Sequence, residues 1–219
     1  MKWSRRHPEL GTSPVPVEAY VSPGFFGREL DSVFRRSWLN VAREEDLPEE
    51  GSYYALDLAA LGTRLLLTRG RDDVVRAFHN VCTHRGTRLV PPGRGRSGLL
   101  TCRYHGWTFT SAGKLAAVPD EKKFADLDKS RCGLRQIQCD IWQGFVFVHL
   151  DPAPERSLAE SVRDLEPAFA RYPVARLVTQ VTYTAEVEAN WKVALDIGEE
   201  PYHFLFVHRR SIPDSHTGV

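Results

Sequence analysis

The sequence predicts an α+β fold, in which an all-β domain is followed by the beginning of a second, mixed domain. Three observations support this. Short apolar runs separated by turn residues fill residues 53–150, helical spacing of apolar residues follows them, and a proline-rich link, Asp151-Pro152-Ala153-Pro154, lies between the two patterns. The expected divisions are an irregular segment with a helix over residues 1–37, the all-β domain over 38–152 and an incomplete second domain over 153–219.

The N-terminal segment is expected to be irregular up to about Gly24, because its prolines interrupt any helix. From Arg28 to Trp38 the apolar residues have the spacing of an amphipathic helix. The first thirty residues contain no long apolar stretch, so we predict neither a secretory signal nor a membrane span. The sequence therefore favours a soluble, cytoplasmic protein.

The middle of the chain has the pattern of paired short strands. Leu65–Leu67 and Val74–Phe78 flank a predicted hairpin turn at Arg69–Asp72, and a second turn is predicted at Ser111–Lys114. So many short strands and turns favour an all-β barrel or sandwich. The last two predicted strands of this part are residues 134–141 and 145–150.

Helical patterns return beyond the proline-rich link. Leu158–Tyr172 has apolar residues at helical spacing, although Pro167 lies late in the run. Val178–Val187 alternates as a strand does, and Asn190 is a suitable N-cap for a helix that begins at Trp191. We therefore expect a helix, a strand and a second helix in this order.

Composition excludes some classes of function. The net charge is +1, with 29 basic and 28 acidic residues interspersed, so no nucleic-acid partner is predicted.

The chain has only four cysteines. Two of them belong to the motif described next. Cys132 and Cys139 could form a disulfide, but reduced core thiols are the favoured interpretation.

Two short segments, Cys82-Thr-His84 and Cys102-Arg-Tyr-His105, each supply one cysteine and one histidine. An extended backbone would direct Cys82 and His84 to the same side. Two such loops facing each other have the ligand set of a Rieske [2Fe–2S] centre, with sulfur on one iron and imidazole on the other. A structural zinc site could use the same four residues. However, zinc motifs usually keep like ligands together, so the mixed order favours the cluster.

The residues around these ligands carry a resemblance to a known family. The sequence resembles the Rieske domain of the aromatic ring-hydroxylating (Rieske non-haem iron) oxygenases, large (alpha) subunit, from about Phe34 to Leu150. The resemblance implies that Cys82, His84, Cys102 and His105 hold the cluster. The matching strings are Phe34-Arg-Arg-Ser-Trp38, Phe78-His-Asn-Val-Cys-Thr-His-Arg-Gly86, Cys102-Arg-Tyr-His-Gly-Trp107 and Trp142-Gln-Gly-Phe-Val-Phe-Val148.

A second candidate site follows Asn190. Asp196, Glu200 and His203 stand at i, i+4 and i+7 among apolar residues, which favours a buried polar stripe. His208 would lie roughly 140° from His203 on an unbroken helix, so a break near Gly198 is needed before both could bind one ion. Two histidines and a carboxylate form the facial triad of non-haem Fe(II) oxygenases.

By the same resemblance, His203 and His208 are implied as ligands of a mononuclear Fe(II). Glu200 is implied as the acidic bridge that links the iron to the cluster of a neighbouring subunit, and Asp196 stands near the iron. The family's catalytic domain is a helix-grip (START-like) fold, and its third iron ligand comes from a later, C-terminal part. This chain ends at Val219, eleven residues after His208, and no motif supports Asp214 or His216 as the missing ligand. We therefore expect a large subunit truncated within its catalytic domain.

The complete enzyme implied by the resemblance takes electrons from NAD(P)H through a reductase, sometimes with a ferredoxin. It uses O2 as a mono- or dioxygenase to hydroxylate or demethylate a small organic substrate, which can be aromatic, and it forms a homotrimer or an assembly with a small subunit. Because the third ligand is absent from this sequence, two alternatives stay open. They are a Rieske electron carrier and an inactive remnant. A zinc-stabilised binding module is a third interpretation, which the order of the ligands disfavours.

Overall fold

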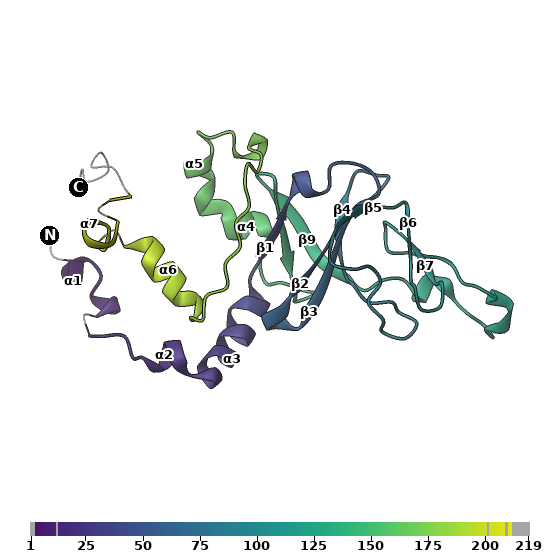
Figure 1. Cartoon of the computed structure of the whole chain (residues 1–219), viewed down its shortest axis with the longest axis horizontal. Coiled ribbons are helices and arrows are strands. Elements are labelled where there is room, and N and C mark those ends of the chain that lie inside the picture. Colours follow the sequence, from purple (N-terminus) through teal and green to yellow (C-terminus); the bar gives the residue numbers. More distant parts are fainter. Residues whose placement is uncertain (1–2, 12, 201, 209, 212–219) are drawn as a thin grey trace. The chain divides into compact units, whose positions relative to one another are not determined.

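The computed structural model describes residues 3–11, 13–200, 202–208 and 210–211. Contacts between residues divide the chain into two compact units (Figure 1). One unit is Glu29–Gln180. The other combines Met1–Arg28 with Val181–Val219. The boundaries predicted after residues 37 and 152 stay predictions, and the two units are described separately.

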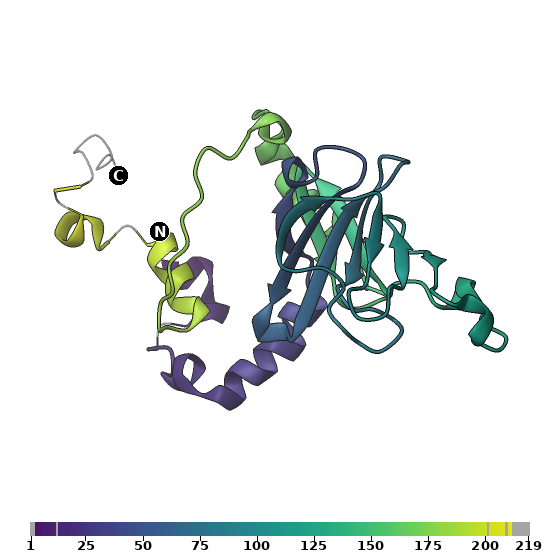
Figure 2. The same cartoon turned by 45° about the vertical axis from the view of Figure 1, so that its right-hand side comes forward.

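Antiparallel strands dominate the unit of residues 29–180, and Figure 2 shows the broad face of its larger sheet. Seven strands form this sheet in the order β1-β10-β9-β4-β3-β2-β5, and β6-β7-β8 form a smaller one. The larger sheet comprises β1 (Leu39–Arg43), β2 (Ser52–Leu58), β3 (Thr63–Arg69), β4 (Val75–His79), β5 (Gly93–Arg96), β9 (Gln136–Trp142) and β10 (Phe145–His149). The smaller sheet comprises β6 (Leu99–Thr101), β7 (Thr108–Thr110) and β8 (Leu115–Ala117).

The structure confirms the predicted hairpin, the second predicted turn and the last two predicted strands. β3 and β4 form the expected hairpin, in which Leu67 faces Ala77. The turn predicted at Ser111–Lys114 connects β7 to β8, and the Thr110 N–H and the Lys114 carbonyl close it with a 2.9 Å hydrogen bond. The last two predicted strands are β9 and β10, which pair antiparallel. With the helices described below, the fold class is α+β, as expected.

Two apolar cores lie on opposite faces of the larger sheet. Along β3 the side chains alternate, so that Leu66 joins one core and Leu65 and Leu67 join the other. All three are fully buried, which explains why this strand is an uninterrupted apolar run. The core that contains Leu66 also contains Cys82 and Cys102. The packing of this face therefore positions the cysteines of both motif loops.

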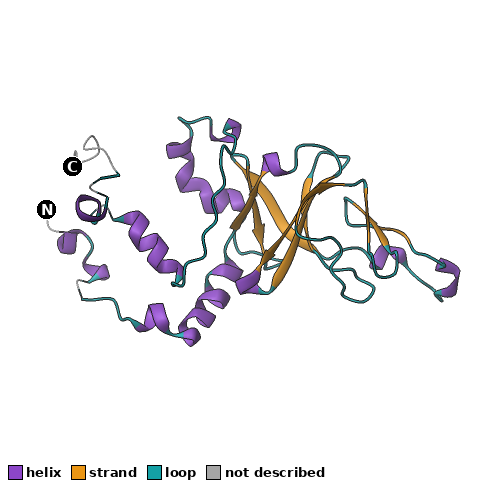
Figure 3. Ribbon diagram, in the orientation of Figure 1, coloured by secondary structure: helices purple, strands orange, loops and turns teal. Residues whose placement is uncertain are grey.

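Seven α-helices are assigned among the described residues (Figure 3). The predictions for the first 38 residues were partly wrong. The helix expected over Arg28–Trp38 begins earlier, because Pro23 occupies its first position, where a missing N–H costs nothing. A 3-10 turn at Phe34–Arg36 follows it. The helices are α1 (Trp3–Arg6), α2 (Glu18–Val21), α3 (Pro23–Ser32), α4 (Leu158–Val162), α5 (Glu166–Phe169), α6 (Trp191–Glu199) and α7 (Phe204–Val207).

The single helix predicted over Leu158–Tyr172 is divided. Ser157 and Glu160 form a capping box at the start of α4. Pro167 lies in the first turn of α5, because proline can begin a helix but cannot continue one. The residues between the two helices, Arg163–Leu165, form a 3-10 turn.

The strand predicted over Val178–Val187 was wrong. The segment is extended coil, and the alternating residues Val181 and Tyr183 are 83% and 87% exposed. A strand needs a neighbouring strand for its backbone hydrogen bonds, and none of the described strands pairs with this segment. Alternation alone therefore gave the wrong assignment.

The cysteines outside the motif loops and the character of the helices complete the description of the fold. Cys132 and Cys139 are free thiols, as favoured over a disulfide, and both are partly buried. Within the described residues, no helix combines the length and apolar character needed to cross a membrane.

Candidate functional site

The two motif loops have the same backbone design. In each loop the cysteine N–H donates to the carbonyl five residues later, over 2.8 Å. The glycine four residues after the cysteine donates its own N–H back to the cysteine carbonyl, over 2.9 Å. The two sets are Cys82, Gly86 and Thr87 in the first loop and Cys102, Gly106 and Trp107 in the second. The loops therefore present their cysteines equivalently, although their histidines stand at different spacings.

The glycines make this design possible. Gly86 and Gly106 adopt φ values of +72° and +73°, in the left-handed region that disfavours residues with a Cβ. At Gly106 there is also no room, since a Cβ would lie 2.8 Å from Cγ of Pro119. At Gly86 a Cβ would meet nothing within 4 Å. Conformation alone requires the first glycine, whereas conformation and packing both require the second.

Different parts of the fold hold each loop. The second loop connects the paired strands β6 and β7, whose last pair is Thr101 with Thr108. The first loop follows β4 and is closed by Asn80. The side chain of this fully buried residue donates to the Val90 carbonyl over 2.9 Å and accepts from the Val90 N–H over 3.0 Å.

Sequence reasoning missed the roles of Asn80 and Thr83. The Thr83 hydroxyl donates to the Cys132 carbonyl over 2.6 Å and ties the first loop to the segment before β9. Both residues belong to the string that carries the family resemblance, and that string was the only available signal. Their partners are 10 and 49 residues away, so local pattern could not reveal the contacts.

The two cysteines lie together in the core. Cys82 and Cys102 are 2% and 3% exposed. Burial raises the pKa of the Cys82 thiol, and the neighbouring Cys102 thiol raises it further. The backbone N–H groups of His84 and Arg85 oppose this by hydrogen bonding to the Cys82 sulfur. A bound metal cation would favour the thiolate forms of both side chains.

The two histidines also lie together, nearer the surface. The ring centroids of His84 and His105 are 4.7 Å apart, and both side chains are half-buried. Partial burial lowers the pKa of His84, and the positive charges of His105 and Arg85 lower it further. This favours the neutral imidazole, the form that binds metals. The buried Trp107 stacks on His84 with centroids 4.7 Å apart and planes 8° from parallel.

The second candidate site begins at α6. The Asn190 side chain accepts from the Lys192 N–H over 3.1 Å, which confirms the predicted N-cap. The helix ends at Glu199, so the break expected near Gly198 is also present. The burial predicted for the polar stripe was wrong, because α6 has no buried residue and Asp196 and Glu200 are exposed.

The break brings the two histidines together. His203 and His208 lie at the two ends of α7, with ring centroids 5.2 Å apart. Nδ1 of His203 lies 2.5 Å from Glu200 Oε1, and this contact lowers the pKa of Glu200. Nδ1 of His208 lies 3.3 Å from the Ser211 hydroxyl. Nδ1 of each ring therefore has a partner, which leaves Nε2 as the nitrogen suited to a metal ion.

Asp196 has a different neighbour. Its Oδ2 accepts a hydrogen bond from the Tyr20 hydroxyl over 2.8 Å. Asp214 and His216 lie outside the described residues. Within the described part of the chain, no three or more His, Cys, Asp or Glu side chains converge on a single ion position. The donor groups gather instead as pairs, one of thiols and two of imidazoles.

Comparisons with known proteins identify the type of domain that contains the two motif loops. Residues 37–138 match the Rieske [2Fe-2S] domain family. The chain is 34% identical to the carnitine monooxygenase oxygenase subunit of Escherichia coli over 86% of its own length and 50% of that protein. It is 32% identical to the toluate 1,2-dioxygenase subunit alpha of Pseudomonas putida over 87% of its length and 43% of that protein. The chain thus spans about half the length of the curated relatives it matches.

Solved structures give the same result. A quaternary ammonium Rieske monooxygenase superposes with a TM-score of 0.80 at 30% identity, over 90% of this chain and 55% of that one. Naphthalene 1,2-dioxygenase from Rhodococcus sp. superposes with a TM-score of 0.78 at 28% identity, over 89% and 46%. Residues 37–138 therefore match the Rieske [2Fe–2S] domain, and the chain is similar to Rieske oxygenase alpha subunits over the part of their length that it spans.

Proposed function

We propose that Cys82 and Cys102 hold one iron of a [2Fe–2S] cluster and that His84 and His105 hold the other. The grouping of the donors supports this assignment. The thiols lie together in the core and the imidazoles lie together nearer the surface. A single tetrahedral zinc would need all four around one point, whereas no such convergence occurs among the described residues. One pair of thiols and one pair of imidazoles therefore suit the two irons of a [2Fe–2S] cluster.

The surrounding residues suit this role. The backbone N–H groups that hydrogen bond to Cys82 favour electron density on its sulfur. Trp107 covers one face of His84 and keeps that ring in a fixed plane. When bound, a Rieske cluster supplies one-electron redox chemistry at a higher potential than a cluster with four cysteine ligands. The half-buried imidazoles are the ligands nearest the solvent, so they form the edge through which a partner would exchange electrons.

We propose His203 and His208 as two ligands of a mononuclear iron through their Nε2 atoms. The carboxylate of Glu200 accepts a hydrogen bond from Nδ1 of His203 and so fixes the tautomer and orientation of the ring. Side-chain exposure of 46% leaves Glu200 accessible to a second imidazole donor, as an acidic bridge requires. Iron held in this way would be the site of O2 activation.

For the whole protein we propose an oxygenase that receives electrons from NAD(P)H through a reductase, with or without a ferredoxin. Its substrate would be a small organic molecule that is hydroxylated or demethylated. The relatives named above include enzymes for carnitine and toluate, and another relative is a glycine betaine monooxygenase subunit. A related quaternary ammonium Rieske monooxygenase of solved structure is described as using inter-subunit electron transfer, which supports a homotrimer or another multi-subunit assembly.

The observation that carries the cluster proposal is the separation of the donors into a sulfur pair and an imidazole pair. The test is anaerobic reconstitution of the purified chain with iron, sulfide and an equal concentration of zinc. Iron and sulfide in equal amounts, with an EPR signal that appears on reduction, are expected. A colourless protein that retains one zinc per chain would overturn the assignment.

A further inference from the structure

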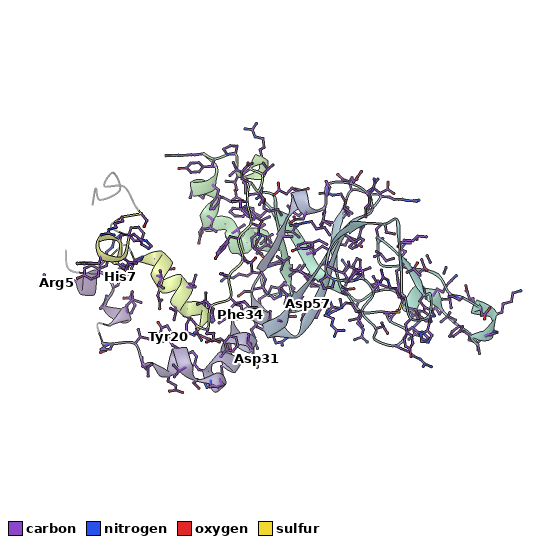
Figure 4. All side chains as sticks on the ribbon, viewed as in Figure 1. Arg5, His7, Tyr20, Asp31, Phe34 and Asp57 are labelled. Atoms are coloured by element: carbon purple, nitrogen blue, oxygen red, sulfur yellow. The ribbon has the colours of Figure 1, made fainter. Side chains whose placement is uncertain are left out.

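A contact between distant segments involves α6, the helix that precedes the histidine pair. Tyr20 on α2 and Asp196 on α6 are 176 residues apart, yet the Tyr20 hydroxyl donates to Asp196 Oδ2 over 2.8 Å (Figure 4, where Tyr20 is labelled). The acceptor is a carboxylate, so this is a charge-assisted hydrogen bond, which is stronger than a neutral one. It joins the N-terminal segment to α6 within the same compact unit.

A second contact joins the same two segments. The Lys192 ammonium lies over three aromatic rings, at 5.5 Å from the centroid of Tyr20, 5.4 Å from that of Phe25 and 5.3 Å from that of Trp191. Each distance is within the range of a cation–π interaction. Lys192 and Asp196 stand four residues apart, so they project from one face of α6. Tyr20 therefore contacts both residues, one through its ring and the other through its hydroxyl.

Burial in a core does not fix the rotation of this helix. None of the side chains of α6 is buried, and Leu195 and Ile197 on its other faces are 49% and 54% exposed. Because α6 has no buried apolar stripe, the polar and cation–π contacts at Lys192 and Asp196 favour the face that meets the N-terminal segment. The direction in which the chain leaves α6 at Glu199 depends on that rotation.

We propose that Tyr20 is a positioning residue, which fixes the rotation of α6 through Asp196 and Lys192 and thereby the start of the segment that carries Glu200, His203 and His208. The functional meaning of this inference rests on the proposed iron ligands. Asp196 is then a structural acceptor for Tyr20, whereas Glu200 is the carboxylate that contacts His203. The N-terminal segment thus contributes to the second site by positioning α6 through Tyr20.

Hydrogen exchange of the α6 amides tests the contact directly, with Tyr20→Phe, Asp196→Leu and the double variant of this chain. Tyr20→Phe keeps the ring for Lys192 and removes only the hydroxyl. Exchange should become about 5- to 10-fold faster in each single variant, which is the effect of one lost hydrogen bond. The double variant should exchange no faster than either single variant, because both substitutions remove the same hydrogen bond. Tyr183→Phe is the matched control, because Tyr183 is 87% exposed, and it should leave α6 unchanged.

A second measurement follows the hydrogen bond itself, in variants whose folded state is checked by circular dichroism. NMR of tyrosines labelled in the ring follows the ionisation of Tyr20, whose signal is the one lost in Tyr20→Phe. The hydrogen bond to Asp196 raises the pKa of Tyr20, so Asp196→Asn should lower that pKa toward its ordinary value. Unchanged Tyr20 ionisation in Asp196→Asn would overturn the proposal, as would unchanged α6 exchange in Tyr20→Phe.

Titration of the wild-type chain with Co(II) separates this inference from the proposed function. A Co(II) absorption spectrum that His203→Ala and His208→Ala abolish supports the proposed metal ligands. If no such spectrum appears while Tyr20 and Asp196 are coupled, the proposed iron ligands fail and the contact stands. If Co(II) binds while Tyr20→Phe changes neither α6 exchange nor the affinity, the positioning role fails and the ligands stand.

Discussion

The cluster loops and the segment around α7 both bring two imidazoles together, but different kinds of contact do so. The loops are fixed by a core that contains both cysteines, by the buried Asn80 and by paired strands. His203 and His208 are held by one turn of helix and by neighbours within three residues, Glu200 and Ser211.

This difference has a physical consequence. The donor atoms of the loops are ordered by folding, so metal binding there has little conformational entropy left to overcome. The α7 segment relies on local contacts that are largely exposed, and these are weaker because water competes for the same groups. We therefore expect the loops to tolerate changes outside their ligands, and the α7 site to be sensitive to single contacts.

The largest effect is expected from Cys102→Ser. A serine hydroxyl is a poor replacement for a cysteine thiolate in an iron–sulfur cluster, so visible absorption and the EPR signal of the cluster should disappear. Cys132→Ser is the matched control, since Cys132 packs against the same core but lies outside the two motif loops. Loss of the signals in both variants, or in neither, would contradict the division between ligand and core thiols.

The alkylation rate of Cys139 on β9 measures how strongly the folded all-β unit shields a buried thiol. Burial raises the pKa of this thiol to about 12, with the Asp140 carboxylate adding to the rise. At pH 9 the native chain should therefore be alkylated at Cys139 up to about a thousandfold more slowly than the urea-unfolded chain, as followed by mass spectrometry.

The same shift predicts how stability depends on pH. Because the folded pKa is above the unfolded one, the contribution of the protonated thiol is fully present below about pH 9 and is lost as the pH rises toward 12. Cys139→Ala should remove this part of the alkaline loss in urea unfolding. Equal alkaline sensitivity in the variant would show that other groups cause it.

A smaller effect is expected from Glu200→Gln. The amide keeps the shape of the side chain but loses the charge that orients His203, so Co(II) affinity should fall by about 10- to 100-fold. Glu199→Gln changes the neighbouring carboxylate in the same way and should leave the affinity unchanged. Equal losses in the two variants would indicate a general electrostatic effect.

The smallest effect separates the two glycines of the cluster loops. Gly86→Ala should lower the free energy of unfolding by about 1 kcal/mol, because only the backbone is strained. Gly106→Ala should lower it further, because the new methyl group would also meet Pro119. Urea unfolding of the reconstituted variants measures both, and an equal cost would count against the packing at Pro119.

Features that depend on local chemistry could be predicted from the sequence. The order of Cys82, His84, Cys102 and His105 states the ligand types directly, and Asn190 caps its helix through a contact two residues away. The hairpins follow from turn residues between apolar runs. These features need no knowledge of distant residues.

Features that depend on distant partners could not be predicted. Asn80 closes its loop through Val90, and Tyr20 reaches Asp196 across 176 residues. The alternation of residues 178–187 indicated a strand, but a strand forms only where a neighbour supplies hydrogen bonds. The burial of the polar stripe failed for the same reason, since burial depends on what covers a helix and not on its own residues.

The most direct test of the account is the nitrogen hyperfine coupling of the reduced cluster, measured by pulsed EPR. In the chain labelled with ¹⁵N-histidine, the signal should show strong coupling to two nitrogens, those of His84 and His105. A reduced centre without strongly coupled histidine nitrogen would contradict the assignment of an imidazole pair to one iron.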